Sequence, residues 1–248
     1  MAWLRYSYTI QSDFTPAVGY HAFKARVVPM ETPFQHVVEQ AVRVNPTCPL
    51  LYAEDGFGNT LVYGSLQEQH RHFLLESTGL VETREYRTPC GAPPDYYLFP
   101  SPQTAWNAEI RALASGKNAL DIMHAVHRHL SYERFRTDNS TTAAQVFRLG
   151  RGVCQDYAHL LIAACRSQGL HARYVNGLAP GEGETHAWVE VYQDGAWLGL
   201  DPTRDCPIAQ GYLKLAHGRD VGDCPSNRGR LYQWTTETLS VNCKLKTL

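Results

Sequence analysis

The sequence lacks an excess of charge of either sign, with 23 Lys and Arg against 24 Asp and Glu in 248 residues and a net charge of −1. No long block of like charge stands out along the chain. Proteins that bind nucleic acid or anionic membranes usually carry a strong basic patch, so we expect neither partner. Hydrophobic residues make up 44% and charged residues 19% of the chain, a composition typical of a folded protein with a substantial core.

Long apolar runs are also missing. No stretch approaches the length that a helix needs to cross a bilayer. The first residues, MAWLRYSYTIQSDF, alternate apolar and polar side chains and do not form the apolar segment of a signal peptide. We therefore expect a strand at the N-terminus, no association with a membrane and a cytoplasmic location.

Several motifs of cofactor and disulfide proteins are absent. The seven cysteines are odd in number and include no Cys-x-x-Cys pair, which suits a reducing compartment. No Gly-rich phosphate loop opens a helix, so nucleotide binding is not predicted. His124, His127 and His129 gather on one predicted helix, but without the i, i+4 spacing and further ligand that metal binding favours. We expect no metal and no other cofactor.

The first hundred residues are typical of β structure. A turn-rich segment around Asp55-Gly56-Phe57-Gly58-Asn59 separates runs rich in aromatic and β-branched residues. These runs predict strands at residues 3–11, 19–28, 34–44, 61–66 and 70–76. We therefore predict an N-terminal antiparallel β-sandwich domain at residues 1–100, followed by a Pro-rich linker within residues 88–102.

The rest of the chain mixes helices with strands. Apolar residues at helical spacing predict helices at residues 104–114, 118–130, 142–149 and 153–168, and strands are predicted at 171–177, 185–192 and 196–200. The helix at 153–168 is apolar nearly all round and should be buried. The chain is therefore predicted to be an α+β protein, with a second, α+β domain at residues 101–248.

Cys154 lies in the first turn of the helix predicted at residues 153–168. Unpaired N–H groups and the helix dipole at that end stabilise a negatively charged sulfur. The same N–H groups can donate hydrogen bonds to a developing oxyanion. A single cysteine at a helix start is more often an inert packing residue, so the case for a nucleophile depends on its partners.

A predicted hairpin supplies those partners. Asp194-Gly195, flanked by alternating apolar residues, predicts a two-residue turn in which Gln193 pairs with Ala196. In that register, the numbers of two paired residues add up to 389, so His186 lies opposite Thr203. Asp201 is two residues before Thr203 on the same strand, so His186 and Asp201 lie on one face as diagonal neighbours. A slip of one residue would place them on opposite faces.

The His186 and Asp201 side chains are the groups that a catalytic cysteine requires. Asp201 would hold the imidazole in one tautomer, and His186 would take the thiol proton and later protonate the leaving amine. Taken singly, a strand histidine and an aspartate before a proline are common structural residues. Cys154, His186 and Asp201 together, in this order, favour a catalytic triad.

The motifs around these residues resemble the core of the transglutaminase-like superfamily, and most closely its bacterial cysteine-peptidase-like branch. The resemblance is carried by residues 152–160 (GVCQDYAHL), 172–177 (ARYVNG), 186–190 (HAWVE) and 201–203 (DPT). Further matches occur at residues 140–143 and 217–220, and in the N-terminal half at Asp55-x-Phe57-Gly58-Asn59 and His70. The resemblance therefore covers nearly the whole chain.

The resemblance implies a papain-like, transglutaminase-like α+β catalytic core in which Cys154 is the nucleophile, His186 the base and Asp201 the orienting carboxylate. It implies a thiol-dependent acyl-transfer enzyme that forms a thioester and cleaves amide or isopeptide bonds in a peptide or protein substrate. Transamidation or amide synthesis with an amine co-substrate is an alternative, as is a catalytically silent peptide-binding module. Association into a homo-oligomer is left open.

Three further residues are predicted near the site. Gln155, next to the nucleophile, would either shape the oxyanion hole or make structural hydrogen bonds. Tyr174 would lie near the sulfur, with core packing as the alternative. Trp188 lies opposite Asp201 in the predicted register and so faces the same region.

Overall fold

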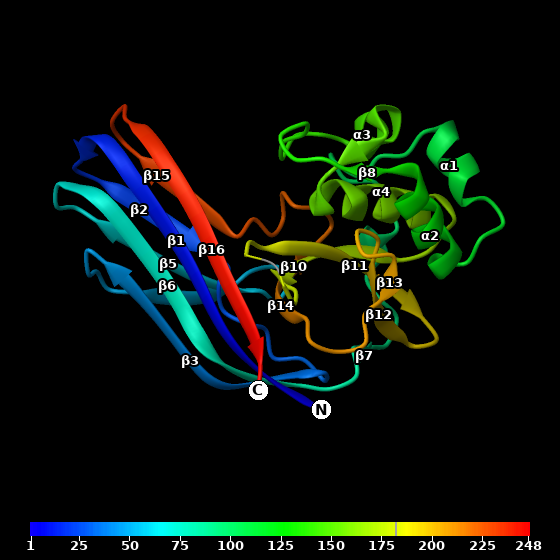
Figure 1. The fold of residues 1–248 in the computed structure, drawn as a ribbon, viewed down its shortest axis with the longest axis horizontal. Coiled ribbons are helices and arrows are strands. Elements are labelled where there is room, and N and C mark those ends of the chain that lie inside the picture. Colours follow the sequence, from blue (N-terminus) through cyan, green and yellow to red (C-terminus); the bar gives the residue numbers. More distant parts are fainter. Residues whose placement is uncertain (182) are drawn as a thin grey trace.

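The computed structural model describes residues 1–181 and 183–248. It confirms the predicted α+β class: a β part built from both ends of the chain lies beside an α+β part built from the middle (Figure 1). The two termini lie side by side, and the N–H of Leu248 donates to the carbonyl of Trp3. Within the described residues, no helix is both long and apolar enough to cross a membrane. The cytoplasmic location stays a prediction.

The β part consists of two four-stranded antiparallel sheets that share one core. Tyr8 and Ile10 from one sheet and Phe23 and Val62 from the other are buried in it, because alternate residues of each strand face inward. The first sheet has the order β16 (Thr236–Thr247), β1 (Ala2–Val18), β6 (His70–Thr83) and β3 (Gln35–Asn45). The second has the order β15 (Asn227–Leu231), β2 (His21–Ala25), β5 (Thr60–Leu66) and β4 (Leu51–Glu54).

The sheets do not follow the predicted division at residue 100. β15 and β16, which fall within the predicted 101–248 domain, pair with β2 and β1 and so belong to the β part. The predicted linker also begins inside a strand, since β7 (Arg87–Pro89) pairs with β12 (Ala196–Asp201) of the other part. Local patterns cannot reveal such pairings, because a strand's partner is chosen by contacts far away in the sequence.

The α+β part is built on a six-stranded sheet with the path β13-β12-β11-β10-β14, to which β7 adds at β12. Helix α4 packs on β10 and β11, and the three other helices pack on α4. Residues Leu160–Ala164 of α4 are fully buried, as its all-round apolar sequence predicts. The helices are α1 (Ala108–Ala114), α2 (Ala119–His129), α3 (Ala143–Leu149) and α4 (Cys154–Ser167). The strands are β10 (Ala172–Leu178), β11 (His186–Gln193), β12 (Ala196–Asp201), β13 (Cys206–Pro207) and β14 (Leu213–Gly218), with β8 (Ser131–Tyr132) paired to β9 (Arg151–Gly152) and a 3-10 turn at Asp95–Tyr97.

Polar side chains of the β part bind the edge strand β14. The amide of Asn59 donates to the carbonyl of His217 and accepts from its N–H, both at 2.8 Å. Gln35 makes the same pair of bonds with the backbone of Lys214, at 2.9 and 2.8 Å. Both amides are fully or almost fully buried, so they replace strand-to-strand bonds that the edge of the sheet would otherwise lack.

Candidate active site

The β11–β12 hairpin brings His186 and Asp201 to the same end of the sheet. Asp194 and Gly195 have φ angles of 50° and 73°, so the turn is of the type in which both central residues are left-handed. The pairs run from Gln193–Ala196 to Val189–Leu200, which confirms the predicted register. His186 opens β11, which packs on α4, and Asp201 ends β12, so both residues lie at the end of the hairpin opposite the turn.

The two side chains form a buried pair. The Nε2–H of His186 donates to Oδ2 of Asp201 at 2.8 Å, and the side chains are only 3% and 0% exposed. The other carboxylate oxygen of Asp201 accepts the backbone N–H groups of Thr203 and Arg204, at 3.0 and 3.2 Å. Burial alone would raise the pKa of Asp201, but its bonds with His186 and Tyr212 hold the pKa below its ordinary value. The carboxylate is therefore ionised and fixed in orientation.

Cys154 is the first residue of α4, and the carboxylate of Asp156 fixes the start of this helix. Oδ2 of Asp156 accepts the N–H of Val153 at 2.7 Å and the hydroxyl of Thr137 at 2.6 Å. A side chain at residue 152 would not fit, because a Cβ on Gly152 would lie 2.5 Å from that oxygen. Glycine at 152 and aspartate at 156 therefore define the path by which the chain enters the helix.

The half-buried thiol of Cys154 and the imidazole of His186 line the same cavity, and the sulfur is near enough to affect the pKa of the imidazole. Because Nε2 of the imidazole is bonded to Asp201, the nitrogen that faces the sulfur is Nδ1. Burial alone would lower the pKa of His186, but the bonds and charges of Asp201 and Cys154 outweigh this and raise it to about 9. The charged imidazolium is thus the favoured form next to the sulfur at neutral pH.

A cavity of about 300 Å³ opens in front of the thiol and the imidazole. Among the described residues, the backbone N–H groups of Cys154 and Gln155 have no hydrogen-bond acceptor, as expected in the first turn of a helix. They are therefore available to an oxygen atom bound in the cavity. The other lining residues are Tyr132, Arg134, Phe135, Val153, Tyr174, Asn176, Glu184, Thr185 and Ala187.

An ion pair joins the two sides of the cavity entrance. Arg134 Nη1 lies 3.2 Å from Oε1 of Glu184, and both side chains are more than half exposed. The next residue, Phe135, is 98% exposed and has a φ of 63°, in the left-handed region that non-glycine residues seldom adopt. An apolar ring and a pair of charges therefore stand at the mouth of the cavity.

The residues predicted near the site occupy different positions. Tyr174 lines the cavity and is buried, and burial raises its pKa well above the ordinary value. The side-chain amide of Gln155 donates to the carbonyl of Asp138 at 3.5 Å, which leaves its backbone N–H as the donor available to an oxyanion. Trp188 does not line the cavity; its ring stacks on His186 with centroids 6.4 Å apart.

The sequence did not reveal Tyr212, which lies beside the His186–Asp201 pair. Its hydroxyl donates to Oδ2 of Asp201 at 2.7 Å, and its ring packs edge-on against Trp188. The residue lies in a turn-rich segment before β14, where no local pattern marks a tyrosine as part of a site.

The sequence also gave no sign of a buried polar network behind Trp188. The indole N–H donates to the hydroxyl of Tyr86 at 2.7 Å, and this hydroxyl donates to Glu190 at 2.8 Å. Glu190 also binds Lys214 and Arg173. Burial alone would raise the pKa of Glu190, but these two cations lower it to about 2, so a fully satisfied carboxylate supports the ring behind His186.

The three histidines of α2 have separate partners. His124 pairs with Asp205 at 2.6 Å, and His127 bonds to the carbonyl of Pro202 at 3.0 Å. His129 bonds to the carbonyl of Phe147 at 2.8 Å. These bonds hold α2 against the end of β12 and against α3. In the described part of the chain, no group of three or more His, Cys, Asp or Glu side chains is arranged to hold a metal ion.

Comparisons with known proteins identify relatives of both parts. Residues 104–202 match the transglutaminase-like superfamily, and residues 4–82 match the bacterial transglutaminase-like N-terminal region. An uncharacterized protein of Mycobacterium tuberculosis is 31% identical, with 73% of this chain and 71% of that protein covered. An uncharacterized protein of Mycobacterium leprae is 26% identical over 83% of this chain and 85% of its own length.

A crystal structure gives the same fold. The protein, from Cytophaga hutchinsonii, carries the name "Putative Cysteine Protease" and is 24% identical in sequence, with a TM-score of 0.83 over 100% of this chain and 91% of that one. At this identity, the similarity shows the fold alone. Both the β part and the α+β part are therefore shared with a solved structure.

Proposed function

The chain belongs to the transglutaminase-like superfamily, and we propose that it is a thiol-dependent acyl-transfer enzyme that cleaves amide or isopeptide bonds in peptides or proteins. The observation that carries the proposal is that Cys154 and His186 line one cavity, while His186 is hydrogen-bonded to the buried carboxylate of Asp201. A cysteine at a helix start is common, but a thiol beside an imidazole that is itself hydrogen-bonded to a buried carboxylate is the arrangement of an activated nucleophile.

In the first half of the reaction, the thiolate of Cys154 attacks the carbonyl carbon of the substrate. A C–S bond forms, and the negative oxygen accepts the N–H groups of Cys154 and Gln155. The imidazolium of His186 then gives its Nδ1 proton to the leaving nitrogen, the C–N bond breaks, and an amine departs. Asp201 keeps its ionised form throughout and stabilises the imidazolium.

In the second half, neutral His186 takes a proton from water, which attacks the thioester and releases a carboxylic acid and the thiol. Hydrolysis is the proposed outcome, because water is always present in an open cavity. An amine in place of water would give transamidation by the same steps. A silent binding module would have no need to keep all three side chains and their hydrogen-bond partners.

The proposal is tested by brief treatment with iodoacetamide over a series of pH values, with peptide mapping of each alkylated cysteine. Cys90, the exposed cysteine among the seven, is the internal reference for an ordinary surface thiol. We expect Cys154 to react faster than Cys90 at pH values below those at which ordinary thiols ionise. His186→Ala should abolish this advantage, whereas Cys90→Ala should leave the rate at Cys154 unchanged.

Two outcomes would reject the proposal. One is that Cys154 in the folded protein reacts no faster than Cys90 at any pH. The other is that His186→Ala, still folded by circular dichroism, keeps the wild-type rate at Cys154. If the thiol is activated, peptide libraries with and without a lysine-like amine would then separate hydrolysis from transamidation, since only the latter attaches the added amine to the acyl group of the substrate.

A further inference from the structure

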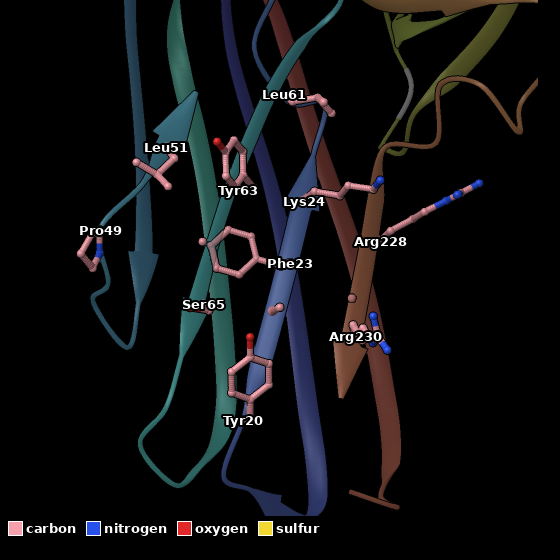
Figure 2. A pocket seen from close by; sticks show the side chains of 13 residues that line it. Tyr20, Phe23, Lys24, Pro49, Leu51, Leu61, Tyr63, Ser65, Arg228 and Arg230 are labelled. Carbon is pink, nitrogen blue, oxygen red and sulfur yellow. The ribbon is translucent and has the colours of Figure 1, made fainter. Parts of the chain in front are cut away.

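A second cavity, of about 700 Å³, lies on the β part (Figure 2), and Cys154 is not among the described residues that line it. It is a groove on the outer face of the sheet formed by β15, β2, β5 and β4. The proposed acyl-transfer mechanism does not use this groove. The pairing of residues between its strands shows which side chains form its two sides.

One row of outward side chains crosses all four strands. Arg228 on β15 pairs with Lys24 on β2, Lys24 pairs with Tyr63 on β5, and Tyr63 pairs with Leu51 on β4. Two residues along, Arg230 pairs with Ala22, which pairs with Ser65. Because the side chains of Ala22 and Ser65 are small, they leave a trough between their larger neighbours.

The two sides of the trough differ in chemistry. The β15–β2 side carries Lys24 and Arg230, and neither has a carboxylate within 4.0 Å among the described residues. The β5–β4 side is apolar, with Tyr63 and Leu51 38% and 54% exposed and Leu61 beside them. Figure 2 shows Lys24 extending toward β15 and the Tyr63 ring standing over the opposite side. The two cations favour an anionic ligand, and the apolar β5–β4 side favours apolar groups on the same ligand.

A protein segment fits both requirements better than a sugar chain does. An extended peptide places successive side chains on opposite sides at a repeat of about 6.6 Å, so acidic and apolar residues can alternate between the two sides of the groove. Sugar hydroxyls need several converging polar side chains. Among the described residues that line the groove, only Ser65 and the tyrosine hydroxyls supply polar side-chain groups besides Lys24 and the arginines.

A strand that forms one side of the groove is anchored to the wall of the active-site cavity. Asn176 lines that cavity, and its side-chain amide donates to the hydroxyl of Ser226 at 2.7 Å. Ser226 immediately precedes β15, which carries Arg228 two residues later. Two residues of extended chain span about 7 Å. Arg228, at one side of the groove, is therefore only a few residues of chain from a side chain that lines the cavity.

We propose that this groove is an exosite that binds an extended, acidic and apolar segment of the protein substrate, while a neighbouring segment enters the cavity at Cys154. The identity of the bound segment as part of a substrate rests on the proposed function. The binding itself does not, because it depends only on the exposed face of the sheet.

The experiment measures fluorescence anisotropy of a fluorescein-labelled peptide of alternating glutamate and leucine, titrated with the full-length Cys154→Ala protein. We expect saturable binding that weakens at high salt. Replacing glutamate by glutamine, or leucine by serine, in the peptide should weaken it further. Lys24→Glu with Arg230→Glu should weaken binding about tenfold, as two partly exposed ion pairs become repulsive.

Two more variants separate charge from shape. Ser65→Trp keeps the charge but fills the trough, and should weaken binding to a similar degree. Lys244→Glu with Lys246→Glu makes the same charge change on the other sheet and should leave binding unchanged. The side chains replaced in these groove and control variants are all exposed on strands, and equal melting temperatures would show that the fold is intact.

The exosite is rejected if the peptide fails to bind, or if it binds the Lys24/Arg230 and Ser65 variants as tightly as the parent. It is also rejected if a polyuronate binds in the groove and the peptide does not, because the ligand would then be an anionic polysaccharide. The two proposals fail separately. Peptide binding without an activated Cys154 rejects the enzyme alone, and an activated Cys154 without peptide binding rejects the exosite alone.

Discussion

Tyr212 gives Asp201 a second side-chain hydrogen bond, in addition to that of His186. In Tyr212→Phe, the carboxylate keeps His186 and two backbone N–H groups but loses the hydroxyl at 2.7 Å. A hydrogen bond to a charged group contributes about 1.5–3 kcal/mol. We expect the alkylation rate of Cys154, and turnover once a substrate is known, to fall by about tenfold, which corresponds to about 1.4 kcal/mol.

A positioning role predicts a particular pattern for Tyr212→Phe. The loss should appear in kcat more than in KM, because Tyr212 is absent from the lining of the cavity. Tyr192→Phe is the matched control, since its hydroxyl makes a 3.3 Å bond to the carbonyl of Cys90, away from the site. Equal reactivity of Cys154 in the Tyr212 variant and the control would contradict the assignment.

His186 should make the stability of the protein depend on pH. Its pKa is about 9 in the folded protein, against an ordinary value of about 6.5 when unfolded. A raised pKa stabilises the folded state fully below about pH 6.5, and this stabilisation is lost as pH rises through about 9. The full effect is on the order of 3 kcal/mol.

The measurement is the free energy of unfolding in guanidinium chloride, for wild type and His186→Asn, across this pH range. Taking the difference between the two proteins removes the contributions of other titrating groups. We expect the advantage of wild type to shrink steadily between about pH 6.5 and 9. An advantage that is constant or grows with pH would mean that His186 is neutral in the folded protein.

At the scale of single elements, the entry into α4 is tightly constrained. Gly152→Ala would bring a Cβ to 2.5 Å from Oδ2 of Asp156, so the carboxylate must leave the N–H of Val153. Loss of a helix cap costs about 0.5–2 kcal/mol, and the first turn, with Cys154, would shift. We expect lower stability and a loss of the Cys154 alkylation advantage. Gly91→Ala is the control, because nothing lies within 4 Å of its added Cβ.

Stability and reactivity need to be measured together for this variant. Thermal unfolding reports the lost cap, and iodoacetamide mapping reports the displaced thiol. A Gly152→Ala protein that is as stable and as reactive as Gly91→Ala would show that the chain can enter α4 by another path, and that the clash is relieved without moving Cys154.

The elements that carry the site could be predicted because their signals are local. Asp194-Gly195 sets the turn, and the turn sets the register that aligns His186 with Asp201. The all-round apolar sequence of α4 predicts its burial, with Cys154 at its first turn. Tyr212 and the Tyr86–Glu190 network were not predictable, because they reach the site through contacts between residues far apart in sequence.

At the scale of the whole molecule, the chain leaves the β part after β6 and returns to it with β15 and β16. The sequence does not predict this return, because residues 227–247 are typical of strands but carry no signal of the sheet that they join. β16 pairs along β1 from Leu4–Thr247 to Thr15–Thr236, so it forms an entire edge of one sheet. The α+β part is therefore an insertion between strands of the β part, and the two ends of the chain are needed to complete one core.

This chain path predicts how fragments behave. A fragment of residues 101–248 keeps β15 and β16 without their partners β2 and β1, and it also loses Asn59 and Gln35 from the edge of β14. Unpaired strands and a freed sheet edge favour aggregation. We expect this fragment to be insoluble or to unfold without a cooperative transition.

A fragment of residues 84–226 is the matched comparison. It removes β15 and β16 as well as β1–β6, and it retains β7, which pairs with β12. Gel filtration and thermal unfolding should show it to be more soluble than 101–248, although less stable than the full chain because β14 is still uncovered. If 101–248 instead unfolds cooperatively and 84–226 does not, residues 227–247 stabilise the α+β part directly. The α+β part would then need these residues more than it needs strands β1–β6.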